Sequence, residues 1–424
     1  LRGITAQDLY RLELITDVRL SPDGKRVVVG VQRVDRKTEK KYANLWMVGT
    51  DGTPAWQFTQ GDQNDASPRW SPDGRTIAFL STRKEGDSAQ VYVISADGGE
   101  ARRLTDLKGD ISSLKWSPDG RTLLLEFTQK DKDVLEREAD EQKKKLGVVS
   151  RHYTRLFYRG DGQGWLGHER THLWLVDVAK GRTKQLTSGS VFDEVNASWS
   201  PDSKSIVFCS NHRPDPDLEP DCVDLFTIPA AGGEPQLITT RPGPKWAPEF
   251  SPDGSQISYV GPRDANEWWQ NVELWTVAAS GKTPARSLTT EHDISLTCST
   301  LNDVGSGLEM PPLWSADGKA IYFQISEHGR TKLMAIAVAD GTLYSVIDEP
   351  GSVGTFTMDA RQEKMAYFFG TMTDPGQVWV RDMETGSTRQ LTHCNQELLS
   401  ELDLGKVEDV WFKARDGHDL QGWI

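Results

Sequence analysis

The chain has 424 residues and a formal net charge of −13, with 37% hydrophobic and 26% charged residues. This acidic balance argues against a nucleic-acid partner, which needs a basic face, and no run of about 18 apolar residues predicts a membrane-spanning helix. The length suffices for two domains or for one large repeat architecture.

A five-residue phrase recurs from the first predicted strands onward. Pro at its second turn position and Gly at its fourth suit a type I turn, and short apolar runs follow each copy. Each copy therefore predicts strand, tight turn, strand, and the aromatic residue before the turn is expected to pack between sheets. The copies WSPDG, WSPDG, LSPDG, WSPDS, FSPDG, WSADG and the decayed MDARQ begin at Trp70, Trp116, Leu20, Trp199, Phe250, Trp314 and Met358.

A second signature alternates with the first. It reads as a strand, a Gly-containing turn and a strand that ends near Leu-Thr. Two hairpins per unit, at a period of about 45 to 50 residues, predict an all-β fold: a seven-bladed β-propeller of four-stranded antiparallel blades. The seven copies begin at Leu45, Val91, Leu173, Leu225, Leu274, Leu333 and Val378.

The predicted strands of each unit come from contiguous sequence. No spare strand at one end completes a blade begun at the other, so the ring is expected to close by packing between the first and last blades alone. This seam is then expected to be the easiest place for the ring to open.

The largest insertion, about residues 129–170, interrupts the third unit. Its first part, DKDVLEREADEQKKKL, predicts a charged, solvated helix. Its second part, RHYTRLFYRGDGQGW, mixes aromatic residues with Arg151, Arg155 and Arg159. We interpret it as an exposed strand and turn, with these three arginines as candidates for binding a peptide carboxylate.

Further insertions follow in the fourth and fifth units. Alternating acids in NHRPDPDLEPDC resemble a calcium loop, but no Gly supports the required turn, so calcium is the weaker reading. RDANEWWQN places Trp268 and Trp269 in a polar loop that could meet a substrate side chain or a partner. The long segment between the fifth and sixth units carries no interpretable pattern.

One motif suggests zinc chemistry. HERTH, from His168 to His172, matches H-E-x-x-H, which binds zinc when both histidines lie on one helical face. Here a glycine-rich turn runs into a strand, where positions i and i+4 lie about 13 Å apart. We therefore expect neither a metal site nor a cofactor.

The remaining chemistry-bearing residues form no recognised site. No Ser has Gly at both −2 and +2, so the chain offers no nucleophile elbow and no catalytic residue. Four scattered cysteines predict reduced thiols and a cytoplasmic protein, with a Cys209–Cys222 disulfide as the alternative.

The tail VEDVWFKARDGHDLQGWI resembles the passage in the prolyl oligopeptidase family of serine peptidases where the propeller returns to the hydrolase domain. The opening LRGITAQDLYRLELITDVRLSPDGKRVVV, together with LFYRGDGQGW and SNHRPDPDLEPDCVDLFTIP, is similar to the acylaminoacyl-peptidase branch. The resemblance implies a segment at 1–16 that packs towards the hydrolase, a propeller at 17–394, and a linker with the first strands of a missing α/β-hydrolase domain at 395–424.

The same resemblance implies a function. The propeller of such a peptidase caps a Ser-Asp-His site that this chain lacks, and restricts access to short peptides that release aminoacyl, acyl-aminoacyl or dipeptidyl groups. Its partners would be the hydrolase domain of the same protein and short peptide substrates. The alternative is a stand-alone TolB-like propeller that acts as a protein-interaction module. Substrate preference and oligomeric state stay open at this point.

Overall fold

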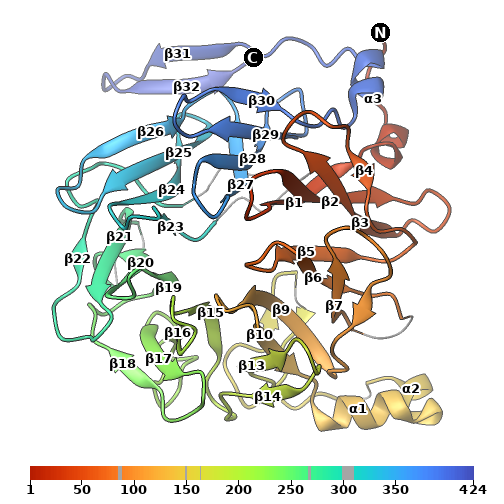
Figure 1. The fold of residues 1–424 in the computed structure, drawn as a ribbon, viewed down its shortest axis with the longest axis vertical. Helices are drawn as coiled ribbons and strands as arrows, with labels where there is room; N and C mark the ends of the chain where they lie inside the picture. Colours follow the sequence, from red (N-terminus) through yellow and green to blue (C-terminus); the bar gives the residue numbers. More distant parts are fainter. Residues whose placement is uncertain (85–87, 149, 163, 266–268, 298–309) are drawn as a thin grey trace.

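The computed structural model describes residues 1–424 except 85–87, 149, 163, 266–268 and 298–309. Antiparallel four-stranded groups follow one another around a central axis, so that the chain returns to its starting point (Figure 1). The predicted all-β fold and its propeller-like arrangement are thereby confirmed.

The first four groups are each a separate sheet in the described part of the chain, and their strands pair in the same antiparallel order. The first contains β1 Leu14–Leu20, β2 Arg26–Val34, β3 Lys41–Gly49 and β4 Trp56–Gln57. The second contains β5 Asp65–Trp70, β6 Thr76–Ser81, β7 Gln90–Ser95 and β8 Arg102–Arg103. The third contains β9 Gly109–Trp116, β10 Thr122–Gln129, β13 Thr171–Asp177 and β14 Thr183–Gln185. The fourth contains β15 Glu194–Trp199, β16 Ser205–Ser210, β17 Asp224–Pro229 and β18 Gln236–Ile238.

Three more groups complete the series. The fifth contains β19 Trp246–Phe250, β20 Gln256–Pro262, β21 Val272–Ala278 and β22 Arg286–Ser287. The sixth contains β23 Leu313–Trp314, β24 Ala320–Glu327, β25 Arg330–Ala337 and β26 Leu343–Ile347. The seventh contains β27 Ser352–Met358, β28 Lys364–Gly370, β29 Gln377–Asp382 and β30 Thr388–Gln390. A single parallel pair, Thr331 with Ser352, joins the last two groups into one eight-stranded sheet.

The remaining elements lie outside the four-stranded groups. They are the 3-10 helix η1 Ala6–Tyr10, α1 Lys132–Ala139, α2 Glu141–Leu146, the hairpin β11 Arg159–Gly160 with β12 Gly164–Trp165, α3 Gln396–Glu401, and the hairpin β31 Asp409–Lys413 with β32 Asp419–Trp423. The charged segment after β10 is helical as predicted, but Asp140 divides it because its side chain caps α2. The described residues contain no helix long and apolar enough to cross a membrane.

The repeated turn works through three of its residues, as the second group shows. Ser71 Oγ donates to Asp73 Oδ1 at 2.6 Å and accepts the N–H of Thr76 at 3.0 Å. Gly74, at φ +69°, donates its N–H to the carbonyl of Ser71 at 2.9 Å. A left-handed residue at this point favours Gly, which explains why the phrase ends on it.

The aromatic residue before the turn ties neighbouring groups together, as predicted. Trp70 Nε1 donates to the carbonyl of Arg19 in the first group at 2.9 Å, and Trp116 Nε1 donates to the carbonyl of Arg69 in the second at 2.9 Å. These two indoles thus each carry a hydrogen bond across an interface while their rings pack there.

The Thr of the Leu-Thr signature has a structural role. In the second group, Thr105 Oγ1 accepts the N–H of Val91 at 3.0 Å and donates to Gln90 Oε1 at 2.9 Å. The equivalent hydroxyls of Thr59, Thr187, Thr289 and Thr392 accept from the third strands of their own groups. The hydroxyl therefore accepts a backbone N–H of the third strand that has no partner in the short fourth strand.

We expect Thr105→Val to lower the free energy of unfolding by about 1–3 kcal/mol, because the N–H of Val91 would be buried without an acceptor and Gln90 Oε1 would keep only the N–H of Leu107. Thr105→Ser keeps the hydroxyl and should lose clearly less. Urea unfolding followed by tryptophan fluorescence compares the two variants, and equal losses would show that the hydroxyl contributes nothing.

The seam between the first and last groups is packed like the other interfaces. Seven apolar clusters each join two neighbouring groups of the described chain, and the seam cluster includes Val18 and Val29 from the first group with Phe368 and Val378 from the last. Among the described residues no strand is exchanged across this seam, as the sequence predicted.

The chain ends add polar ties across the same seam. Asn395 bonds Glu13 reciprocally, amide to main chain, at 2.8 Å in both directions. Arg11 holds Glu401 through two bonds of 2.7 Å, and Arg2 reaches the same carboxylate at 3.1 Å. The pKa of Glu401 falls to about 2, chiefly because of Arg11. The prediction that the ring opens most easily at this seam therefore stays a prediction. The hydrogen bonds and ion pairs of the chain ends, which the sequence did not reveal, oppose such opening.

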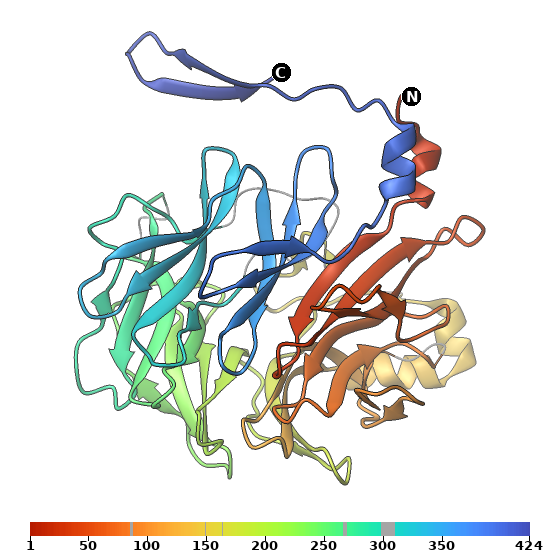
Figure 2. The ribbon, with the colours of Figure 1, turned by 45° about the horizontal axis from the view of Figure 1, so that its top comes forward.

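The antiparallel topology gives the ring two different faces. First-to-second and third-to-fourth turns share one face, the turn face, while second-to-third connections and the links between groups share the other, the loop face. All three predicted insertions are on the loop face because they join second to third strands. The hairpin β31–β32 lies beyond this face (Figure 2), and Trp411 contacts His328 there at 5.1 Å between ring centres.

Candidate functional site

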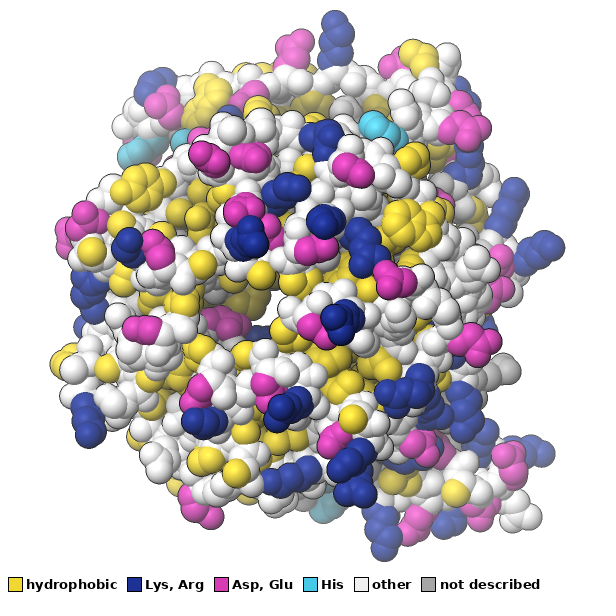
Figure 3. Space-filling view, in the orientation of Figure 1, with side chains coloured by type: hydrophobic (Ala, Val, Ile, Leu, Met, Phe, Trp, Pro, Cys, Tyr) yellow, Lys and Arg dark blue, Asp and Glu magenta, His cyan; other side chains and the backbone are white. Residues whose placement is uncertain are grey.

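A cavity of about 800 Å³ occupies the centre of the ring, and we call it the central channel. Its walls include residues from the first strand of every four-stranded group: β1, β5, β9, β15, β19, β23 and β27. The space-filling view is hollowed at the same place (Figure 3). A side chain that points inward from a first strand therefore decides what this channel can hold.

Bulges in the first strands help to aim these side chains. The pairing register shifts between Ala66 and Arg69 in the second group. Similar shifts in the fourth and fifth groups precede Ser198 and Glu249. A residue with positive φ lies within each of these three bulges: Ser67, Asn196 and Ala247, at +52°, +55° and +52°. Bulges of this kind re-aim a side chain and are frequent beside functional sites.

One repeat position supplies most of the polar character of the channel. It is the residue directly before the aromatic or apolar residue that opens each turn, and in chain order it is Arg19, Arg69, Lys115, Ser198, Glu249, Leu313 and Thr357. Six of these line the cavity, and the seventh, Ser198, donates to Glu249. Sequence reasoning missed this set, although aligning the seven turn phrases shows that the position before the aromatic varies in charge while the turn does not.

Two of the arginines share one carboxylate. Asp17 Oδ1 lies 2.7 Å from Arg19 Nε, and Asp17 Oδ2 accepts from Arg69 Nη1 at 2.8 Å. Burial opposes ionisation of Asp17, but Arg19 and Arg69 outweigh it and lower its pKa. Burial, and then repulsion from Arg69, lower the pKa of Arg19 to about 10. At neutral pH this corner therefore holds two positive charges against one negative charge.

The opposite wall is electrically balanced. Lys115 Nζ, from β9, binds Glu249 Oε1, from β19, at 2.8 Å. The other oxygen of Glu249 accepts from Ser198 of the intervening group. This contact bridges three consecutive first strands and neutralises the third cation of the channel.

A second cavity, of about 850 Å³, lies on the loop face between the hairpin β31–β32, α3 and loops of the sixth and seventh groups. The turn His328–Gly329 has both φ values positive, at +50° and +67°, and brings β24–β25 against the hairpin. Several partly exposed apolar side chains line this cavity: Ile4, Met372, Leu404, Val407 and Trp423. Apolar surface gathered in this way marks an interaction site.

Two of the predicted site residues belong to an aromatic cluster in the third-group insertion. The guanidinium groups of Arg151 and Arg159 lie 5.2 and 5.4 Å from the ring centre of Trp165. Tyr153 and Tyr158 stack on the same indole. The predicted strand and turn is present as β11–β12, but these two arginines lie against a ring, away from the central channel.

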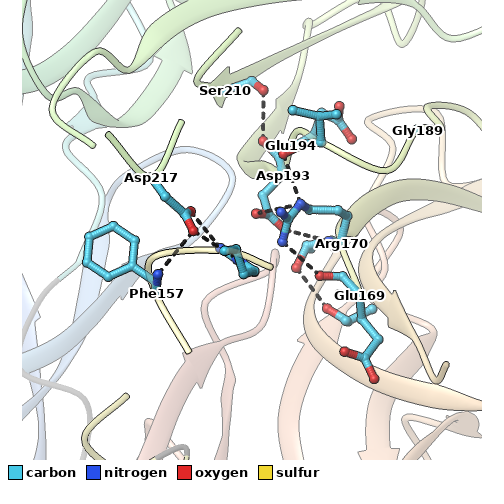
Figure 4. A network of polar contacts seen from close by, with 12 residues as sticks. Phe157, Glu169, Arg170, Gly189, Asp193, Glu194, Ser210 and Asp217 are labelled. Carbon is cyan, nitrogen blue, oxygen red and sulfur yellow. Dashed lines mark hydrogen bonds and ion pairs between the residues drawn. The ribbon is translucent and has the colours of Figure 1, made fainter. Parts of the chain in front are cut away.

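Arg155 has a different setting. Its Nε and Nη2 donate to the carboxylate of Asp217 at 3.0 and 2.8 Å, and the N–H of Phe157 donates to the same group (Figure 4). Arg155 thus joins the insertions of the third and fourth groups. Asp217 is one of the alternating acids that resemble a calcium loop, and its carboxylate is bound by Arg155. The described residues contain no cluster of three or more potential metal ligands.

We expect Arg155→Met to free the third-group insertion, because the largely buried carboxylate of Asp217 would lose its counter-ion. Chymotrypsin should then cleave several-fold faster at Leu156–Tyr158, whose side chains are exposed. Arg151→Met is the matched control and should leave the rate near that of the parent chain. Equal rates for both variants would contradict the anchoring role.

The HERTH motif spans a loop and a strand, as predicted. His172 lies buried in β13, with Nδ1 at 2.7 Å from Glu194 and Nε2 at 3.0 Å from the carbonyl of Gly189, whereas His168 precedes the strand. Burial lowers the pKa of His172, but Glu194 outweighs it and the net pKa is raised. Its neighbour Arg170 binds the carbonyl of Val191 (Figure 4).

Two other predictions meet the structure only in part. Trp268 lies outside the described residues, and Trp269 is 68% exposed. Cys209 is buried and Cys222 is partly exposed, and both are free thiols, so the alternative disulfide is wrong.

Comparison with known proteins finds peptidases among the relatives of this chain. Residues 16–153 match the family described as the TolB beta propeller domain. The uncharacterized peptidase YuxL of Bacillus subtilis is 28% identical over 99% of this chain and 63% of its own length. Dipeptidyl-peptidase 5 of Porphyromonas gingivalis is 26% identical over 99% of this chain and 60% of its own length. The chain thus spans about three fifths of the curated relatives it matches.

Solved structures agree on the fold. The acylaminoacyl peptidase of Pyrococcus horikoshii superposes with a TM-score of 0.77 at 18% identity, covering 99% of this chain and 59% of that one. The β-propeller domain of the Trilobed protease from Pyrococcus furiosus, described as having an open velcro topology, has a TM-score of 0.64 at 18% identity and covers 91% and 97%. Residues 16–153 therefore match the TolB beta propeller family, and the two relatives that align with 99% of this chain are peptidases, as the sequence resemblance predicted.

Proposed function

We propose that residues 1–424 are the non-catalytic, substrate-selecting part of a serine peptidase that hydrolyses short peptides. Supporting observations are the alignment of 99% of this chain with two peptidases, of which it spans 63% and 60%, and the absence of a nucleophile elbow in its sequence. The seven four-stranded groups are then the blades of a seven-bladed propeller, and the Ser-Asp-His triad belongs to an α/β-hydrolase domain that continues the same protein.

We place the contact with that domain on the loop face. The observation that carries the proposal is the exposed apolar surface of the hairpin on this side of the ring. The hairpin β31–β32 extends away from the ring and exposes Trp411, Phe412, Leu420 and Ile424, which are 44% to 80% accessible. Apolar side chains at such exposure favour burial against a further domain, at about 25 cal/mol for each Å² covered. In this division, 1–16 and 395–424 accompany the hydrolase while 17–394 form the propeller.

The central channel and the loop-face cavity support size selection. Cavities of about 800 and 850 Å³ hold a short extended peptide and exclude a folded domain. In the proposed arrangement a substrate reaches the hydrolase only through these cavities. The group released from the peptide is then an aminoacyl, acyl-aminoacyl or dipeptidyl group.

Labelling with a serine-directed fluorophosphonate tests whether the catalytic serine lies outside residues 1–424. Residues 1–424 should take up no label and hydrolyse no peptidyl ester, whereas the protein extended through its hydrolase domain should label at a single serine. Labelling of the isolated residues would contradict the proposal. An extended gene product without a G-x-S-x-G serine would instead favour the TolB-like interaction module, for which the match at 16–153 is the supporting observation.

A further inference from the structure

The positive charge of the central channel gathers in one arc. Among the seven equivalent positions, the first three in chain order are Arg19, Arg69 and Lys115, and the groups that carry them are neighbours in the ring. Lys115 is neutralised by Glu249 at 2.8 Å. The uncompensated charge therefore lies at Arg19 and Arg69, which share Asp17.

Arg19 has unused donors. Arg19 Nε lies 2.7 Å from Asp17 Oδ1 but lacks the geometry of a hydrogen bond there, and neither terminal nitrogen of Arg19 bonds an acceptor among the described residues. A guanidinium carries five N–H donors in a planar fork that matches a carboxylate. The side chain lines the channel and is only 17% accessible, so it is held rather than free to turn into bulk solvent.

The carboxylates that line the same cavity are already engaged. Glu126 accepts the N–H of Ala197 at 2.8 Å, Glu249 binds Lys115, and Asp359 accepts the N–H of Glu363 at 2.8 Å. Burial raises the pKa of Glu126. Among the described residues none of these three acids pairs with Arg19 or Arg69, whose shared counter-ion is Asp17.

The wall beside Arg19 is apolar. β1 adjoins β27, where the N–H of Leu20 donates to Thr357 Oγ1 at 2.8 Å. Phe356 and Met358 of that strand line the channel together with Met310 and Leu313. Paired arginines beside an apolar wall fit a carboxylate that carries an apolar side chain next to it, which is the chemistry of a peptide carboxyl terminus.

We propose that Arg19 and Arg69 bind the free carboxylate at the end of a short peptide inside the central channel. The terminal nitrogens of Arg19 take one carboxylate oxygen or both, while Asp17 keeps the two guanidinium groups in position. This proposal rests on the proposed peptide-selecting function. It names the group that is recognised, which is the free carboxylate at the end of the peptide. This group would bind within the central channel, away from the loop face.

Isothermal titration of residues 1–424 with acetyl-Ala-Ala-Ala-Leu tests the site. The free acid should bind at least about tenfold more tightly than its carboxamide, since the amide loses the charge-assisted hydrogen bonds. Arg69→Gln should weaken binding of the acid about tenfold and leave the amide unchanged. Arg69→Lys, which keeps the charge near Asp17, should fall between the parent chain and Arg69→Gln. Arg75→Gln, an exposed arginine on the turn face, is the matched control and should match the parent chain.

Two outcomes would overturn the proposal. Equal affinity for acid and amide, or an unchanged acid-to-amide ratio in Arg69→Gln and Arg69→Lys, would show that the arginines do not hold the terminus. A carboxamide peptide with an internal Glu that binds as tightly as the free acid would assign the site to side-chain carboxylates instead. Because the titration involves no hydrolysis, its failure leaves the fluorophosphonate test of the proposed function untouched.

Discussion

Asp17→Asn should lower the free energy of unfolding by about 3–5 kcal/mol, the usual cost of removing one partner from a buried ion pair. The asparagine keeps the shape of the side chain and can still accept the N–H of Val18, which lies at 2.9 Å. It cannot balance Arg19 and Arg69, whose side chains are 17% and 28% accessible. Two guanidinium groups would then face each other without a counter-ion. Urea unfolding followed by tryptophan fluorescence measures the loss.

Two further variants separate charge from packing. Asp97→Asn removes a carboxylate that is 90% accessible and 3.4 Å from Arg26, and should cost less than about 1 kcal/mol. Adding Arg69→Gln to Asp17→Asn should recover part of the loss, because one of the two repelling charges is gone. If Asp17→Asn costs no more than Asp97→Asn, the channel arginines are not held in the way described above.

Phe368→Ala should also lower the free energy of unfolding by about 3–5 kcal/mol, through lost burial and the cavity left behind. Phe368 is fully buried in the apolar cluster that joins the last group to the first. The surroundings cannot collapse easily around the cavity, because a side chain at Gly376 would already collide with the Phe368 ring. The same urea titration applies.

Phe208→Ala is the matched control, since Phe208 is equally buried between the third and fourth groups. Similar losses would place the seam on a par with an interior interface. A loss below about 1 kcal/mol for Phe368→Ala alone would mean that the first and last groups are not packed together, and would restore the seam as the weakest interface.

Much of the fold could be predicted because it depends on local chemistry. The Ser-Pro-Asp-Gly phrase forms its turn with hydrogen bonds inside six residues, such as Ser71 to Asp73 and Thr76 to Ser71. The Leu-Thr signature caps its own group, as Thr105 does for Val91. The hydrogen bonds that form these turns and caps lie within one repeat. The number and order of the repeats could therefore be predicted from the sequence.

The candidate site could not be predicted in the same way. Arg19 and Arg69 meet only because two first strands from different groups converge on Asp17, and bulges with a left-handed residue such as Ser67 alter the direction of the side chains. The sequence indicates Arg155 as a candidate for binding a peptide carboxylate, yet its carboxylate partner Asp217 lies 62 positions away in another insertion of the same chain. Contacts between repeats depend on the closure of the ring, which no single repeat encodes.

Cleavage by the whole peptidase of one scissile sequence, presented once as a short peptide and once within a loop of a folded protein, tests the proposed selecting role most directly. We predict that kcat/KM is at least about a hundredfold higher for the peptide than for the folded protein, because cavities of about 800 and 850 Å³ hold an extended chain but not a folded domain. Equal kcat/KM for both substrates would contradict it.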